Sequence, residues 1–129
     1  MARVMIVDDA EFMRMAVRDT LLKHGHEVVA EVADGDEAIQ KYLEIKPDLV
    51  IMDIVMPDNI GVIPENFGWK ETLNKFLLID NDAKVAMSSS LGQQTLITES
   101  VKIGSMGFIV KPFEHDGMLD VIRKIREPN

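Results

Sequence analysis

The sequence lacks several features that would place it in a specialised class. It has no cysteine, which excludes disulfides and thiolate metal sites. It has no apolar run near the roughly 18 residues of a membrane span, and no signal-peptide pattern at its start. The net charge of -8, without any basic face, disfavours nucleic acid as a ligand. We therefore expect a cytoplasmic protein without membrane insertion.

The familiar phosphate-binding motifs are also missing. The chain contains neither the G-x-x-x-x-G-K-[ST] loop nor a G-x-G-x-x-G stretch after a strand. Asp53, Ile54 and Val55 do not form the D-x-D motif of a phosphatase nucleophile. These absences disfavour an enzyme that turns over an external phosphoester.

The length and composition are those of one globular domain. The 129 residues, 47% hydrophobic and 28% charged, are enough for one buried core. We therefore expect residues 1–129 to form a single domain that carries the whole function.

Short apolar runs alternate with segments whose apolar residues recur at helical spacing. Near-continuous apolar strands indicate a sheet covered on both faces. The pattern predicts a doubly wound α/β fold, with a five-stranded parallel sheet and helices on both faces. The expected strands are Val4 to Val7, Val28 to Val32, Leu49 to Met52, Val85 to Met87 and Phe108 to Val110. The expected helices are Phe12 to Leu22, Ala38 to Ile45, Trp69 to Ile79, Gln93 to Lys102 and Asp116 to Arg126.

Polar residues follow four of these strands. They are Asp8 and Asp9, then Asp53, then the serines at 88–90, and then Lys111. Parallel sheets bind ligands at the carboxyl ends of their strands, so we expect these side chains to meet there. For Asp8 and Asp9 a second interpretation stays open, in which the acids only suit a helix N-terminus.

Such a set of side chains suits phosphoryl chemistry. Carboxylate oxygens are ligands for Mg²⁺, which keeps water positions for a phosphoryl group. An aspartate carboxylate can itself accept a phosphoryl group, and a lysine would offset its charge. The sequence therefore predicts a magnesium-dependent phosphoacceptor site.

The spaced motifs resemble the receiver domain of two-component response regulators, in particular stand-alone chemotaxis regulators of the CheY type. The resemblance rests on Asp8 and Asp9, Asp53 with Met56 and Pro57, a serine after strand four, and 111–113, read Lys-Pro-Phe. Phe12 to Arg14 and Leu91 to Gln94 are similar to the chemotaxis branch. The resemblance implies a flavodoxin-like receiver fold and phosphorylation of Asp53 by a histidine kinase. Such a receiver is not an enzyme, although it takes part in its own phosphorylation and dephosphorylation.

The resemblance also implies a role for each site residue. Asp9 and Asp53 would bind Mg²⁺ directly, Asp8 would act mainly through a bound water, and the carbonyl of Val55 would complete the protein ligands. Lys111 would act beside Asp53. Among the three serines, spacing to Lys111 within the family pattern selects Ser89 as the hydroxyl that moves to the phosphoryl group. Phe108 would turn inward behind it, and it could equally be a plain core aromatic.

One stretch departs from the family pattern. The loop between Asp53 and the third helix is longer than usual by about eight residues. The extra residues lie at about 58–68, where Gly61, Pro64 and Gly68 interrupt any regular helix. We interpret the stretch as a surface insertion, with a lid or partner surface as the alternative.

Three versions of the function remain open at this point. The leading version is a monomeric chemotaxis regulator that contacts a histidine kinase and a flagellar or archaellar switch protein or phosphatase. A second is a phosphorelay shuttle that passes the group between histidine proteins. A third is a pseudo-receiver, an interaction module that is never phosphorylated.

Overall fold

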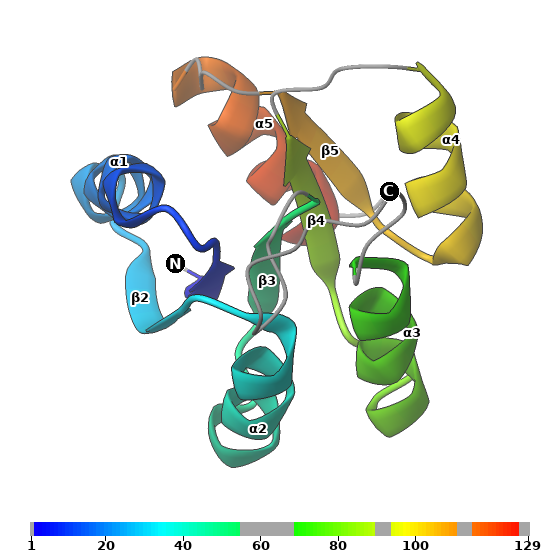
Figure 1. The fold of residues 1–129 in the computed structure, drawn as a ribbon. Helices are drawn as coiled ribbons and strands as arrows, with labels where there is room; N and C mark the ends of the chain where they lie inside the picture. Colours follow the sequence, from blue (N-terminus) through cyan, green and yellow to red (C-terminus); the bar gives the residue numbers. More distant parts are fainter. Residues whose placement is uncertain (1, 55–68, 90–93, 111–114, 127–129) are drawn as a thin grey trace.

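The computed structural model describes residues 2–54, 69–89, 94–110 and 115–126. Within these ranges, strands and helices alternate along the chain (Figure 1). The strands are β1 (Arg3–Val7), β2 (Glu27–Val32), β3 (Leu49–Asp53), β4 (Val85–Ser89) and β5 (Gly107–Val110). The helices are α1 (Glu11–Lys23), α2 (Gly35–Ile45), α3 (Trp69–Ile79), α4 (Gln94–Ile103) and α5 (His115–Arg126).

The five strands form one parallel sheet in the order β2-β1-β3-β4-β5. From β1 the chain first moves to one edge of the sheet, and it then returns to the other side of β1 and continues outward. The strand order therefore reverses between β1 and β3, which is the position where doubly wound sheets bind ligands. The predicted doubly wound fold is confirmed.

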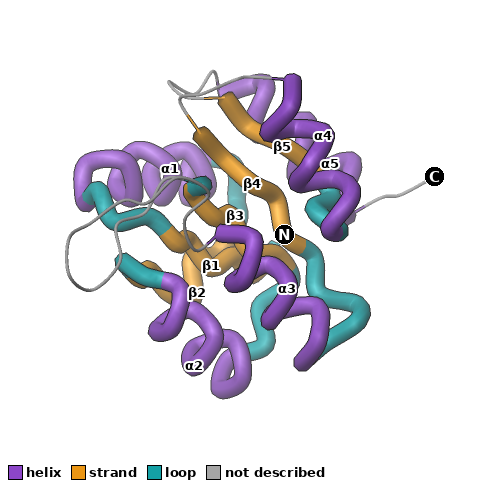
Figure 2. Tube along the Cα trace, turned by 45° about the vertical axis from the view of Figure 1, so that its right-hand side comes forward, coloured by secondary structure: helices purple, strands orange, loops and turns teal. Residues whose placement is uncertain are grey.

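Alternating side chains of the strands build a core on each face of the sheet. Met5, Met52 and Met87 are buried on one face, against residues of α2 and α3. Ile6 and Ile51 are buried on the other face, against α1 and α5. Figure 2 shows α2 and α3 side by side on their face of the strands. The period of two explains why the strand sequences look continuously apolar, since both faces are covered.

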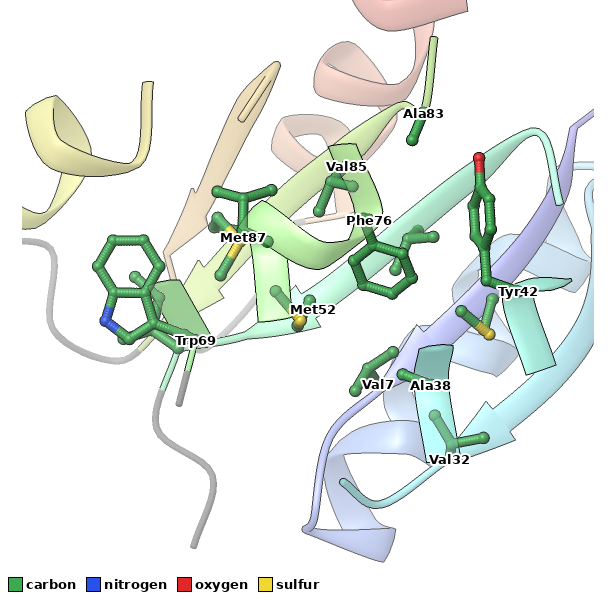
Figure 3. Packing of buried hydrophobic residues seen from close by; sticks show 14 residues of the cluster. Val7, Val32, Ala38, Tyr42, Met52, Trp69, Phe76, Ala83, Val85 and Met87 are labelled. Atoms are coloured by element: carbon green, nitrogen blue, oxygen red, sulfur yellow. The ribbon is translucent and has the colours of Figure 1, made fainter. Parts of the chain in front are cut away.

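Helix α3 follows the sequence prediction over its full length. Trp69, Leu73 and Phe76 recur on one face and are at most 2% exposed. Figure 3 shows Trp69 and Phe76 on the strand side of α3, over Met52 and Met87. The ring of Tyr42 from α2 meets Phe76 edge to face, with centroids 5.2 Å apart. The extended loop expected at about 58–68 lies outside the described residues.

Helix α2 begins earlier than its apolar spacing predicts. The side chain of Asp34 accepts a hydrogen bond from the Glu37 N–H at 2.8 Å, which caps the helix start. Gly35 then lies so close to Thr72 of α3 that an added Cβ would overlap the threonine hydroxyl. The cap and this close approach fix how α2 packs on α3.

The described helices are short. They contain between 10 and 13 residues each. No helix among residues 2–54, 69–89, 94–110 and 115–126 combines the length and apolarity that a bilayer span requires.

Candidate functional site

Three carboxylates converge where the strand order reverses. Asp8 follows the last residue of β1, Asp9 comes next, and Asp53 is the last residue of β3. One oxygen of each lies within 4.8 Å of the other two. Asp8 and Asp53 are 3% and 6% exposed, whereas Asp9 faces solvent. The sheet therefore brings together the acids that the sequence singled out.

The backbone holds Asp8 tightly in this place. Its N–H donates to the carbonyl of Val32 at the end of β2, at 3.0 Å. Its Oδ1 accepts a hydrogen bond from the N–H of Ala10 at 2.9 Å. Ala10 is the cap residue of α1 and makes no side-chain cap bond. Asp8 therefore accepts a hydrogen bond from the N–H of the residue just before the helix. The helix N-terminus interpretation thus explains part of the role of Asp8 and Asp9, but not all of it.

The donor set fits a small hard cation. Three carboxylates this close repel one another, and a bound cation relieves the repulsion. Octahedral ligands at about 2.1 Å from Mg²⁺ lie roughly 3 to 4 Å from each other, which the spacing of these oxygens accommodates with small adjustments. Asp8, Asp9 and Asp53 are therefore able to hold a metal ion. Val55, the fourth expected ligand, lies outside the described residues.

Two serines complete the described part of this edge. Ser88 pairs with Asp53 across the β3–β4 ladder, and the next residue, Ser89, ends β4. Their exposed fractions are 2% and 0%. Ser89 in turn pairs with Val110, the last residue of β5. Lys111, which follows Val110, and the third serine, Ser90, lie outside the described residues, so the choice of Ser89 stays a prediction.

Phe108 lies on β5, opposite Met87 of β4. It is partly buried and packs against the core cluster on the α2 and α3 face. This position agrees with the core role that the sequence allows. Its second role, as an aromatic that changes position on phosphorylation, stays a prediction.

Arg14 is a residue of this edge to which sequence reasoning assigned no role. Its Nη1 donates to the carbonyl oxygen of Asp8 at 2.6 Å. In the sequence, Phe12 to Arg14 stand out only because they resemble chemotaxis regulators. Helical spacing places residue 14 one turn after Ala10, but it does not say that the side chain turns back toward Asp8.

The sequence profile of the response regulator receiver domain matches residues 4–123. The chain belongs to the response regulator receiver family. Its receiver sequence is 42% identical to the chemotaxis protein CheY of Thermotoga maritima, over 95% of this chain and 96% of that protein. It is 37% identical to the CheY of Halobacterium salinarum, over 95% of each chain.

Solved structures agree with this assignment. A chain of the CheX–CheY–BeF₃–Mg²⁺ complex from Borrelia burgdorferi has a TM-score of 0.84 and 29% identity. The match covers 97% of this receiver and 89% of that chain. A CheY-like receiver from Methanospirillum hungatei has a TM-score of 0.79 and 25% identity, covering 96% and 93%. The chain is thus a receiver of two-component signalling with CheY relatives, and neither the shuttle nor the pseudo-receiver is favoured.

Proposed function

We propose that this receiver is a chemotaxis response regulator that accepts a phosphoryl group on Asp53 from the phosphohistidine of a histidine kinase. The observation that carries the proposal is the convergence of Asp8, Asp9 and Asp53 within 4.8 Å at the strand reversal. The CheY relatives support the chemotaxis role, because they match almost the whole chain. The cytoplasm is the proposed location, because a histidine kinase would draw on ATP there.

The transfer is a substitution at phosphorus. An oxygen of the Asp53 carboxylate attacks the phosphorus of the phosphohistidine, a P–O bond forms, and the P–N bond breaks. The leaving imidazole nitrogen keeps the electron pair of that bond and takes up a proton. Asp53 is 6% exposed at the end of β3, and this burial supports the proposal because it limits the orientations that the attacking carboxylate can adopt.

Asp8 and Asp9 with Asp53 would hold Mg²⁺, and the Val55 carbonyl would complete the protein ligands. When bound, the cation would offset negative charge on the phosphoryl oxygens. Lys111 would supply a further positive charge at the same edge. Ser89 would donate its hydroxyl to a phosphoryl oxygen, and Phe108 would then pack in a second position. Phosphorylation would shift the population toward this second packing, because the phosphoryl group interacts more favourably with the second packing than with the first.

The partners follow from the same chemistry. The histidine kinase supplies the phosphoryl group, and a flagellar or archaellar switch protein or a phosphatase reads or removes it. The acidic chain would act as a monomer through protein contacts. Outside its own phosphorylation and dephosphorylation, it would catalyse no reaction.

Intact-mass analysis after incubation with acetyl phosphate tests the acceptor. We expect the wild-type protein to gain one phosphoryl group with Mg²⁺ and none with EDTA. Asp53→Asn should gain none while it keeps a folded far-UV spectrum. Labelling of a folded Asp53→Asn protein, or no labelling of the wild type, would contradict the proposal.

A matched pair tests the serine. Ser88 and Ser89 are adjacent and both buried, so Ser88→Ala controls for the removal of a buried hydroxyl. We expect Ser89→Ala, and much less Ser88→Ala, to slow labelling and to weaken binding of the phosphorylated protein to a switch protein. Equal effects of the two substitutions would remove the special role of Ser89.

A further inference from the structure

Arg14 reaches from α1 to the main chain at the end of β1. Its Nη1 lies 2.6 Å from the carbonyl oxygen of Asp8, a short charge-assisted hydrogen bond. The arginine side chain is only 19% exposed. A partly buried guanidinium directed at one carbonyl restricts the peptide unit that joins Asp8 to Asp9.

Other hydrogen bonds also hold Asp8. The N–H of Asp8 is held by the Val32 carbonyl at 3.0 Å, and its Oδ1 by the Ala10 N–H at 2.9 Å. The Arg14 bond holds the carbonyl on the other side of the same residue. The plane of the Asp8–Asp9 peptide sets where both carboxylates point, because each side chain starts from one end of it.

Glu31 of β2 holds Arg14 in place. Its Oε1 lies 3.8 Å from Arg14 Nε, and its Oε2 accepts a hydrogen bond from Arg18 Nη1 at 3.0 Å. Arg18 also lies 3.9 Å from Asp19. Both arginines therefore share Glu31, but of these two described side chains, only Arg14 bonds to the Asp8 carbonyl.

We propose that Arg14 is a positioning residue for the divalent-cation site, holding the Asp8 carbonyl so that the Asp8 and Asp9 carboxylates face Asp53. The inference rests on the proposed function, because it concerns the same cation site. Residues that orient metal ligands through hydrogen bonds typically change metal affinity by 10- to 100-fold when they are replaced.

Charge and geometry predict opposite results when Arg14 is replaced. A positive charge beside the site repels a cation, so its removal alone would tighten Mg²⁺ binding. Loss of the positioning bond would weaken Mg²⁺ binding instead. The sign of the change therefore separates positioning from simple electrostatics.

Calorimetric titration with Mg²⁺ alone, without any phosphodonor, gives the affinity directly. We expect Arg14→Met to bind Mg²⁺ about tenfold more weakly than the wild type. Arg14→Lys, which keeps the charge and can make one hydrogen bond, should recover part of the loss. Arg18→Met removes the same charge one helical turn further on, and it should bind Mg²⁺ as the wild type does or slightly more tightly. Wild-type or tighter binding by folded Arg14→Met would overturn the inference.

Thermal unfolding in EDTA checks that each variant is folded. Should Arg14→Met not fold, Arg14→Lys tests the same point. It keeps the positive charge but should weaken Mg²⁺ binding, by less than tenfold, and unchanged affinity would overturn the inference. Labelling by acetyl phosphate separates the two proposals. If the wild type binds Mg²⁺ and is labelled, and Arg14→Met binds Mg²⁺ equally well, then only the role of Arg14 is ruled out. If the wild type binds no Mg²⁺, both proposals are ruled out.

Discussion

The two ends of the sheet both carry clustered aspartates, but they arrange them in opposite ways. At the carboxyl edge, Asp8, Asp9 and Asp53 converge on one another. At the amino edge, a cleft of about 350 Å³ is lined by Tyr42, Pro47, Asp48, Asp80, Asp82 and Lys84. The comparison shows what separates a candidate cation site from an acidic surface.

At the amino edge, the protein itself provides hydrogen-bond donors to the acids. Asp80 accepts a hydrogen bond from the Tyr42 hydroxyl at 2.7 Å and another from the Asp82 N–H at 2.9 Å. Asp48 accepts one from the Arg3 N–H at 2.9 Å. The Tyr42 bond, followed by that of the Asp82 N–H, holds the pKa of Asp80 below its ordinary value. Figure 3 shows the Tyr42 hydroxyl pointing away from Val7 and Ala38.

The difference lies in what neutralises the charge. At the amino edge, neighbouring donors stabilise the carboxylates of Asp48 and Asp80 separately. At the carboxyl edge, two of the three acids are buried and all three lie within 4.8 Å, so a shared cation is the simplest compensation. Four measurements test this contrast.

The largest expected effect is stabilisation by Mg²⁺. An ion that binds only the folded state at 100 times its Kd stabilises it by about 2.7 kcal/mol. We expect this gain for the wild type, its removal by EDTA, and its loss in Asp9→Asn. Asp82→Asn is the matched control at the amino edge and should keep the full gain. Thermal melts with and without Mg²⁺ measure it, and equal shifts in both variants would abolish the contrast.

The second effect concerns the hydrogen bond at the amino edge. Tyr42→Phe keeps the ring contact with Phe76 but removes the hydroxyl, so we expect a loss of about 1 kcal/mol in the free energy of unfolding. Urea denaturation at neutral pH measures this loss. The loss should be the same with and without Mg²⁺. A Mg²⁺-dependent loss would mean that the two edges are coupled.

The third effect is that Asp9→Asn should change the free energy of unfolding in the opposite direction when no metal is present. Removing one of three neighbouring negative charges relieves repulsion, which should raise the free energy of unfolding in EDTA by less than about 1 kcal/mol, because Asp9 is exposed. Asp82→Asn should show no such gain. A destabilised Asp9→Asn in EDTA would show that the cluster is already compensated by the protein.

The smallest effect is a pH dependence at the amino edge. Burial, and next the bond to Asp80, raises the pKa of Tyr42 above its ordinary 10.0. The contribution of Tyr42 to the free energy of unfolding is therefore complete below pH 10 and is lost as pH rises further. The pKa of Asp80 is lowered from 3.8, so its contribution is present above that pH and is lost as pH falls through the folded-state pKa. The stability deficit of Tyr42→Phe should therefore be constant between about pH 5 and 9 and shrink outside that range. Unfolding curves across pH measure this deficit. A deficit that does not change with pH would contradict a stabilising hydrogen bond between Tyr42 and Asp80.

Much of the fold could be predicted from hydrophobic period alone. All five expected strands lie within the observed ones, and α3 has the predicted bounds. The start of α2 differs because of a polar contact, since the Asp34 cap adds residues before Ala38. Apolar spacing reports the buried face of a helix, and caps lie outside that face.

The sequence by itself determined that these acids share one edge of the sheet. Parallel strands bring their carboxyl ends to the same edge, so Asp8, Asp9 and Asp53 are expected there once the strands are recognised. The strand order β2-β1-β3-β4-β5, which places β1 beside β3, comes from the tertiary structure. Only the tertiary structure decided how they are held. The bond from Arg14 to the Asp8 carbonyl joins residues six positions apart, and Glu31 comes from a different strand. Side-chain direction and the distance between elements set such contacts, and neither follows from the period of the sequence.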